Sequence, residues 1–143
     1  MLAKNAPLQR TYLRQILTYL ATYAVMYGSS QWMEQSKGLR PSTVGLVLVG
    51  MSLLLGFMNG FSGFGNQATL YLQAPAGDIA VASGLLRTST YIGAIFSSSL
   101  IGITFGPAAT DAGFHTLAWG LVGIGLVVLI LTALDRSVPT VAE

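Results

Sequence analysis

The chain contains no cysteine, a single histidine and few charged residues, which make up only 8% of its 143 residues. The absence of cysteine excludes a disulfide framework and thiolate chemistry. Soluble domains carry about 25% charged residues, which help to cover their surface. A chain with 52% hydrophobic residues and so little charge cannot cover a soluble surface, so the sequence predicts an integral membrane protein.

The charged residues are also clustered, and they leave three long charge-free runs at residues 41–77, 88–110 and 112–134. A helix needs about 20 mostly apolar residues to cross the hydrocarbon of a bilayer. Helices are expected because lipid offers no partner to unpaired backbone groups, and four strands are too few to close a barrel. The sequence therefore predicts an all-α fold. It forms a single transmembrane domain, residues 1–143, with four spans at about 12–32, 44–65, 80–105 and 114–134.

Basic residues flank the hydrophobic runs instead of forming a patch, which argues against a nucleic-acid partner. Their placement predicts the orientation of the chain, because cytoplasmic loops are enriched in lysine and arginine. The end of the bundle that holds both termini collects four basic residues and the opposite end collects two: Lys4, Arg10, Arg14 and Arg136 against Lys37 and Arg40. Both termini are therefore expected in the cytoplasm.

A glycine-rich stretch in the second span has two interpretations. Residues 63–68 read GxGxxA, as in a dinucleotide-binding loop, but that loop needs a soluble βαβ unit and an acidic residue about 20 positions on. Asp78 lies only 15 residues after Gly63. Small residues at four-residue spacing instead let membrane helices approach closely. The predicted helix-packing residues are Gly56, Gly60, Gly63, Gly102 and Gly106.

Polar aromatic residues recur along one face of the first span. Tyr19, Tyr23, Tyr27 and Gln31 are spaced four residues apart, which places them on one slowly drifting helix face. Tyrosines usually lie at the membrane interfaces, and the first two of these fall too deep for that. The face either packs inside the bundle or lines a substrate cavity, where aromatic rings with polar tips suit amphipathic ligands.

Amides and charges in the remaining spans leave similar alternatives open. Asn59, Asn66 and Gln67 either hydrogen-bond between helices or form the polar wall of a cavity. Glu34 is either an acid that couples transport to protons or a solvated loop residue. Arg87, about two turns into the third span, either reaches the interface and sets the orientation or pairs within the bundle as part of a conformational switch.

The motifs of common enzyme and metal sites are missing. The sequence contains no HExxH, no cluster of metal-ligating residues, no nucleophile motif and no phosphate-binding loop. We therefore expect neither an enzyme nor a bound cofactor or metal.

Two stretches carry recognisable motifs. In residues 31–46, Gly38, Leu39, Pro41, Gly45 and Leu46 follow a pattern near G-L-x-P-x-x-x-G-L. In residues 74–93, Ala82, Ser83, Gly84, Leu85, Thr88 and Gly93 follow a pattern near P-x(n)-A-S-G-L-x-x-T-x-x-x-G, with one residue more before Gly93. The two stretches resemble the end of the seventh helix with its following loop, and the start of the penultimate helix, of transporters of the major facilitator superfamily, and within it of the drug:proton antiporters.

The resemblance implies a partial C-terminal bundle of a major facilitator-type fold. The order of the spans resembles helix seven, then one span that begins like helix eight and continues like helix ten, then helices eleven and twelve, so it implies a truncated chain with an internal deletion. It implies cavity-facing roles for the tyrosines and amides of the first two spans. For the complete protein, it implies proton-coupled efflux of small amphipathic compounds across the cytoplasmic membrane.

The implied partners are the lipid bilayer, a small-molecule substrate, and either a missing N-terminal half or further copies of the chain. Alternating access needs two halves that move about a central site, which four helices alone do not supply. Two other interpretations therefore stay open. The chain could be a small four-span protein that acts as an oligomer, or a non-transport partner in membrane-protein assembly or regulation.

Overall fold

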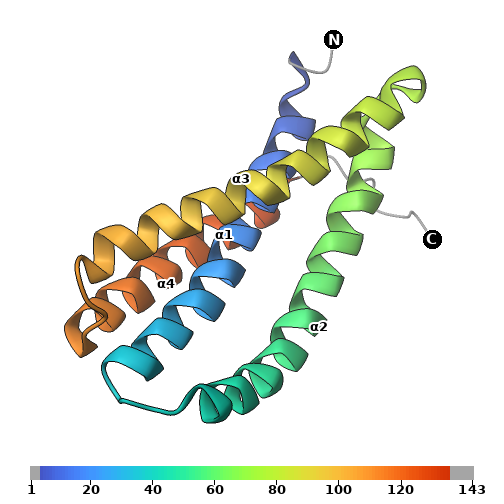
Figure 1. The fold of residues 1–143 in the computed structure, drawn as a ribbon. Coiled ribbons are helices and arrows are strands. Elements are labelled where there is room, and N and C mark those ends of the chain that lie inside the picture. The colour runs from blue at the N-terminus through green and yellow to red at the C-terminus, as the bar shows by residue number, and fades with distance from the viewer. Residues whose placement is uncertain (1–3, 136–143) are drawn as a thin grey trace.

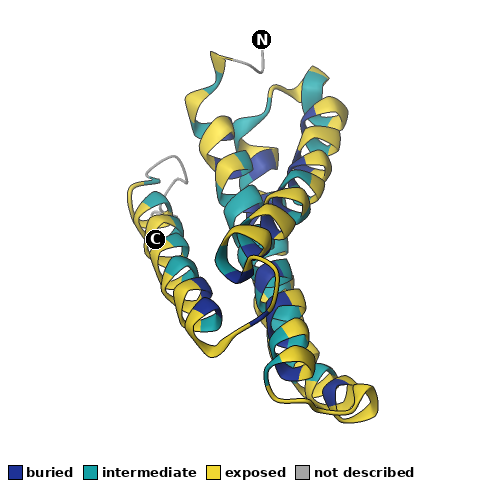
Figure 2. Cartoon of the chain, turned by 60° about the vertical axis from the view of Figure 1, so that its left-hand side comes forward, coloured by how far each residue is buried: buried dark blue, intermediate teal, exposed yellow. Residues whose placement is uncertain are grey.

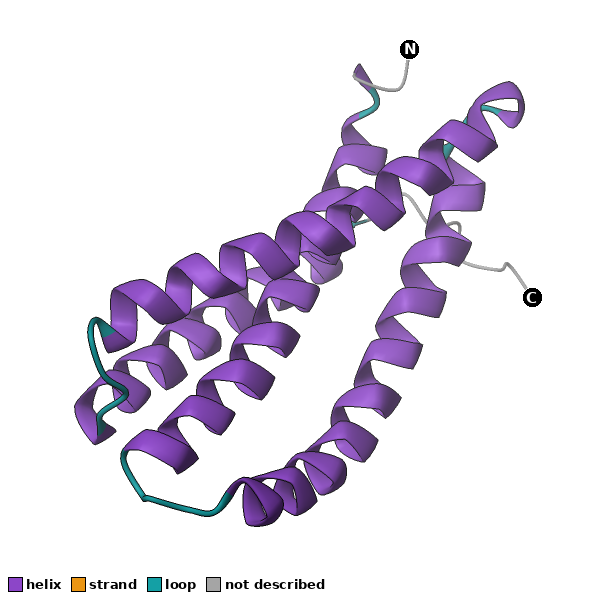
Figure 3. Ribbon diagram, in the orientation of Figure 1, coloured by secondary structure: helices purple, strands orange, loops and turns teal. Residues whose placement is uncertain are grey.

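The computed structural model describes residues 4–135, and within them the chain consists of helices and short loops (Figures 1 and 3). The four long helices are α1 (Ala6–Gln35), α2 (Pro41–Gln73), α3 (Ile79–Phe105) and α4 (Asp111–Ala133), and a short 3-10 helix, η2 (Ala76–Asp78), precedes α3. The predicted all-α fold with four long helices is confirmed. Arg136, one of the basic residues that predict the orientation, lies outside the described residues.

Local sequence signals set where the helices begin and end. The side-chain oxygen of Asn5 accepts a hydrogen bond from the Leu8 amide at 3.2 Å, and the Thr110 hydroxyl accepts one from the Gly113 amide at 3.1 Å. Both contacts satisfy backbone donors that a first helical turn leaves free. Gly106 has a φ of 60° and terminates α3, a conformation that glycine adopts without steric cost.

The helices are longer than the predicted spans. The largest difference is in α2, which continues eight residues past the predicted edge at residue 65. The helix continues because residues 66–74 contain no glycine or proline, and the next proline is Pro75. Three segments are long and apolar enough to cross a membrane by composition: α2, residues 76–105, and α4. α1 is too polar to be among them, and its predicted span at residues 12–32 stays a prediction.

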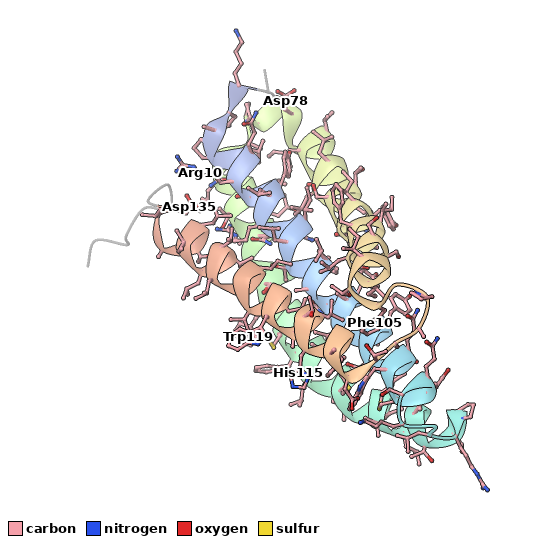
Figure 4. All side chains as sticks on the ribbon, turned by 90° about the vertical axis from the view of Figure 1, so that its left-hand side faces the viewer. Arg10, Asp78, Phe105, His115, Trp119 and Asp135 are labelled. Carbon is pink, nitrogen blue, oxygen red and sulfur yellow. The ribbon has the colours of Figure 1, made fainter. Side chains whose placement is uncertain are left out.

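Consecutive helices run in opposite directions. At one end of the bundle, the side-chain amide of Asn5 donates to the backbone carbonyl oxygen of Gln73 at 2.8 Å, and Arg14 pairs with Asp135 at 3.2 Å. At the other end, the Ala109 amide donates to the side chain of Gln35 at 2.8 Å. Both described ends of the chain therefore lie at the same end of the bundle (Figure 1). Figure 4 likewise shows Arg10, Asp78 and Asp135 toward one end and His115 toward the other.

α1 is the central helix and packs against α2, α3 and α4. Between residues 15 and 30 its side chains are buried or half-buried, except that of Tyr27. α2 and α4 are mostly exposed, and α4 buries only Gly113 and Leu117 (Figure 2). Two apolar clusters form the core, one toward each end: Leu8, Leu70, Ala82 and Leu86, and Ala24, Ile101, Phe105, Ala109 and Leu117.

At Gly93 the backbone of α3 passes close to the backbone of α1. A Cβ atom at Gly93 would lie 2.5 Å from the Ile16 carbonyl oxygen and 3.0 Å from the Leu20 nitrogen, both of which are backbone atoms. By contrast, a Cβ atom at Gly56, Gly60, Gly102 or Gly106 would meet no atom of this chain within 4 Å. Within residues 4–135 these four predicted packing glycines do not bring helices together, and a packing role remains a prediction about contacts with other chains.

We expect Gly93→Ala to destabilise the protein by about 1–3 kcal/mol, because a methyl group there must push the backbones of α1 and α3 apart. Gly102→Ala is the matched control on the same helix, where the added methyl meets open space and alanine's higher helix propensity contributes up to about 1 kcal/mol. The midpoints of thermal unfolding of the purified protein in detergent measure both effects. Equal midpoints for the two variants would contradict the described crossing of α1 and α3.

Candidate functional site

A chain of polar side chains crosses the bundle near the end that holds Arg14. Arg14 Nη1 donates to Asp135 Oδ2 at 3.2 Å, and its Nε donates to Asn66 Oδ1 at 2.7 Å. Asn66 Nδ2 donates to Gln15 Oε1 at 2.7 Å, and Gln15 Nε2 donates to Thr90 Oγ1 at 3.0 Å. These five residues, here called the polar network, join α1 to α2, to α3 and, through Asp135, to the segment that directly follows α4.

The polar network is largely shielded from its surroundings. The side chains of Arg14 and Asp135 are 11% and 3% exposed, and Asn66 and Gln15 are buried. A buried charge is costly unless it is paired and hydrogen-bonded, and here each charge has the other as its partner. No buried side-chain nitrogen or oxygen among the described residues lacks a hydrogen-bond partner. The network therefore holds its helices at a fixed rotation relative to one another.

Beside the polar network, two adjoining hollows follow the junction of α1 with α3, and together they are called the α1–α3 groove; Gln15 and Thr90 belong to both the network and the groove. The polar hollow, of about 640 Å³, is lined by Gln15, Tyr19, Gly63, Gln67, Tyr71, Ser83, Gly84, Leu86, Arg87 and Thr90. The tyrosine hollow, of about 580 Å³, is lined by Tyr23, Tyr27, Gln31, Ala94, Ile95, Ser98 and Ile101.

The two hollows adjoin because the residues that line the second follow directly after those that line the first, on both α1 and α3. The Tyr19 and Tyr23 rings, one in each hollow, have their centroids 6.3 Å apart, and the Tyr23 and Tyr27 rings stack at 5.9 Å with an interplanar angle of 9°. On α3, Thr90 lines the first hollow and Ala94, one turn on, lines the second. The four-residue spacing thus produces an aromatic row along the groove.

The structure brings together six of the nine residues predicted for the substrate cavity and for coupling. Tyr19, Gln67 and Arg87 meet in the polar hollow, although they come from three helices. Tyr23, Tyr27 and Gln31 meet in the tyrosine hollow. Their contact with substrate stays a prediction, because the geometry shows a groove and not its occupant.

The other three residues lie elsewhere. Asn66 belongs to the polar network, where both ends of its amide are engaged within the bundle. Asn59 accepts a hydrogen bond from the Thr22 hydroxyl at 3.0 Å and lines a mainly apolar hollow between α1, α2 and α4. Glu34 is exposed in the last turn of α1 and is not among the residues that line the groove.

The opposite end of the bundle is fixed by Asp111, the first residue of α4. Its carboxylate accepts hydrogen bonds from Trp32 Nε1 at 2.8 Å, Ser36 Oγ at 2.9 Å and Lys37 Nζ at 2.9 Å. The Trp32 ring also stacks on Phe114, with centroids 4.4 Å apart. This cluster ties the α1–α2 loop to the start of α4, so its evident role is structural.

Sequence reasoning missed the polar network as a unit. The sequence suggests only an orienting role for Arg14, and it assigns no role to Gln15, Thr90 or Asp135. One signal was available: if consecutive spans alternate in direction, then Arg14 near the start of the first span and Asp135 just after the last share one end of the bundle. Opposite charges at the same depth predict an ion pair, but the sequence does not give the helix rotations that bring them into contact.

The groove offers recognition chemistry: aromatic faces, amides, hydroxyls and one guanidinium. Within residues 4–135 no group of three or more histidine, cysteine, aspartate or glutamate side chains could hold a metal ion. Aromatic rings and a few well-placed polar groups are the usual lining of small-molecule sites.

The fold and the groove define a multi-pass helical membrane protein with a candidate small-molecule site. The chain is distantly similar to an uncharacterized MFS-type transporter, YwoD, of Bacillus subtilis. The two are 29% identical over 109 residues, which cover 62% of this chain and 24% of the relative. The match thus covers about a quarter of the length of that curated relative. No model of a known protein family matches the chain, and no solved structure matches it.

We expect Asn66→Leu to destabilise the protein by about 1–3 kcal/mol, because it leaves the Nε donor of Arg14 and the Oε1 acceptor of Gln15 without a partner in the bundle interior. Asn59→Leu is the matched control: it removes one hydrogen bond, to Thr22, and such bonds contribute roughly 0.6 kcal/mol in membrane proteins. Unfolding of the two variants in detergent, followed by circular dichroism, compares them. A larger loss for Asn59→Leu would show that the network does not hold the helices together.

Proposed function

We propose that this chain forms part of a major facilitator-type transporter of the drug:proton antiporter kind, and that the α1–α3 groove is one wall of its substrate cavity. The complete assembly would exchange protons for small amphipathic compounds across the cytoplasmic membrane, with both ends of this chain on the cytoplasmic side. The observation that carries the proposal is the continuous row of Tyr19, Tyr23 and Tyr27 along a groove of hydrogen-bonding side chains. The distant similarity to a transporter supports it.

The groove suits an amphipathic compound because its two kinds of surface lie side by side. Tyrosine rings provide flat apolar faces, and the amides of Gln31 and Gln67 and the hydroxyl of Ser98 provide hydrogen bonds. Polar side chains at membrane depth are costly in lipid and are favoured where they face water or a ligand. A row of such residues along one groove is therefore better explained by a hydrated cavity than by a lipid-facing surface.

The α1–α3 groove forms only one wall of the proposed substrate cavity, and a closed cavity needs a facing wall. Alternating access requires two bundles that rock about a site near the middle of the membrane. We propose that the facing wall comes from further transporter helices, either in a second half or in another copy of this chain. The transporter to which this chain is similar has about four times the length of the matched segment, so the rest of its chain is long enough to contain such helices.

Proton coupling needs a carboxylate in a low-dielectric site, where its pKa can respond to its partner. Glu34 is exposed at the end of α1, whereas the Asp135 side chain is 3% exposed and paired with Arg14. Of these two, Asp135 meets the requirement better on geometry. We therefore place proton coupling at the Arg14–Asp135 pair and regard Glu34 as the weaker candidate.

A second function, that of an assembly or regulatory partner, is favoured by a different surface. Phe57, Phe61 and Phe64 on α2 are 71%, 70% and 79% exposed, and with Gly56 and Gly60 they line a shallow hollow. Small residues between exposed rings are a common contact surface for another membrane helix. If this is the main role, Gly60→Leu abolishes a discrete complex in crosslinking while compounds that fit the groove have no effect.

The transporter proposal predicts that the α1–α3 groove contains water. Because the chain has no cysteine, single introduced cysteines can be labelled without background. N-ethylmaleimide is uncharged and reacts with the thiolate, which forms in water and not in lipid. Ser98 lines the tyrosine hollow and Ser99, its neighbour at the same depth, does not, so we expect Ser98→Cys to react at least about tenfold faster than Ser99→Cys in reconstituted membranes.

The comparison of neighbouring residues controls for depth in the membrane and for helix fraying. Equal labelling rates, or faster labelling of Ser99→Cys, would contradict a hydrated groove and with it the proposed transport function. Circular dichroism of both variants checks that each is folded.

A further inference from the structure

Arg87 is the one charged residue among those that line the α1–α3 groove. It lies on α3, and its side chain is exposed to the polar hollow. Among residues 4–135 it has neither a hydrogen bond nor an ion pair, whereas Arg14 and Lys37 both have acidic partners. An arginine within a membrane-spanning segment is costly unless an anion or water satisfies its five N–H donors.

The acidic residues of the described chain are all placed where they cannot serve Arg87 in the groove. Asp135 pairs with Arg14, and Asp111 pairs with Lys37 at the opposite end. Glu34 lies in the last turn of α1, at that same opposite end. Asp78 precedes α3, nine residues before Arg87, which is about 13 Å along the helix. The lining of the polar hollow contains no carboxylate.

Further hydrogen-bond donors surround Arg87. The hydroxyl groups of Tyr19 and Tyr71 come from α1 and α2, and Ser83 lies one turn before Arg87 on the same face of α3. Ser83 accepts a hydrogen bond from Gln67 Nε2 at 3.3 Å, which leaves its own proton free to donate. A guanidinium beside hydroxyl donors matches an anionic oxygen group such as a carboxylate, sulfonate or phosphodiester, and it repels a cation.

We propose that the polar hollow binds the anionic group of an amphipathic ligand through Arg87, while the apolar body of the ligand extends along the tyrosines of the neighbouring hollow. This inference rests on the proposed substrate cavity and names the class of compound that the cavity takes. The shared chemistry is an anion on an apolar body, and it has two sources: a soluble aromatic anion or the headgroup of an anionic lipid.

The test uses two probes with the same ring system and different charge, 2-naphthoate and the neutral 2-naphthamide. Ser83→Cys is the reporter, because it lies next to Arg87 in the polar hollow and substitutes sulfur for oxygen. The rate of its reaction with N-ethylmaleimide is measured in phosphatidylcholine nanodiscs at increasing probe concentration. We expect 2-naphthoate to protect the cysteine at a concentration about tenfold lower than 2-naphthamide, because a charge-assisted hydrogen bond is much stronger than a neutral one.

A second substitution assigns the preference to Arg87. In the Ser83→Cys background, Arg87→Gln is expected to make the two probes equally effective, and Arg87→Lys to keep part of the preference for the anion. Arg10→Gln, which removes an exposed arginine outside the groove, is expected to leave the preference unchanged. Equal protection by the two probes with Arg87 present overturns the inference, as does a preference that survives in Arg87→Gln.

The same assay distinguishes a lipid headgroup from a soluble ligand. It also distinguishes failure of anion binding at Arg87 from failure of the proposed cavity. If an anionic lipid headgroup occupies the hollow, adding phosphatidylglycerol to the nanodiscs slows the labelling of Ser83→Cys without any probe, and Arg87→Gln restores the rate. If the ligand is soluble, labelling without probe is the same in both membranes. Failure of the inference alone leaves Ser98→Cys more reactive than Ser99→Cys, whereas unreactive cysteines at both positions 83 and 98 overturn the cavity as well.

Discussion

The ion pair between Arg14 and Asp135 is the interaction on which the arrangement of the helices depends. It joins the start of the bundle to its end, and Arg14 passes the connection on through Asn66 and Gln15 to α2 and α3. Association of helices in a membrane lacks the hydrophobic driving force available in water, so packing and polar contacts must supply it. A buried charge restricts the geometry further, because its partner must stay in place whenever the helices move.

The central position of α1 explains why its composition differs from that of the other helices. α2 and α4 expose most of their surface, and both are apolar enough to span a membrane. α1 is surrounded by protein along most of its length, so it can carry arginine, glutamine, threonine and tyrosine, which a lipid-facing helix cannot. One side of α1 uses these groups in the polar network, and another leaves its tyrosines along the groove. The residues that hold the bundle and those proposed to bind a ligand thus belong to the same helix.

Much of the fold could be predicted because charge and hydropathy vary along a membrane chain on the scale of whole helices. The hydrophobic segments between the clusters of charge predicted the number of long helices, and the four-residue spacing of Tyr19, Tyr23 and Tyr27 predicted a shared face. Contacts that depend on helix rotation could not be predicted. Asn66 and Gln67 are neighbours with similar chemistry, yet about 100° of helical rotation places one in the polar network and the other in the groove. Likewise, Gly93 and Gly102 look equivalent in sequence, and only Gly93 faces α1.

The most direct test of this account is a double-mutant cycle on the ion pair, with Arg14→Gln, Asp135→Asn and the double variant. Each single substitution leaves one buried charge without its partner, while the double variant leaves none. We expect the double variant to be more stable than either single variant, as measured by the free energy of unfolding in detergent. If the two losses simply add, the charges do not interact in the folded protein, and the polar network does not organise the bundle.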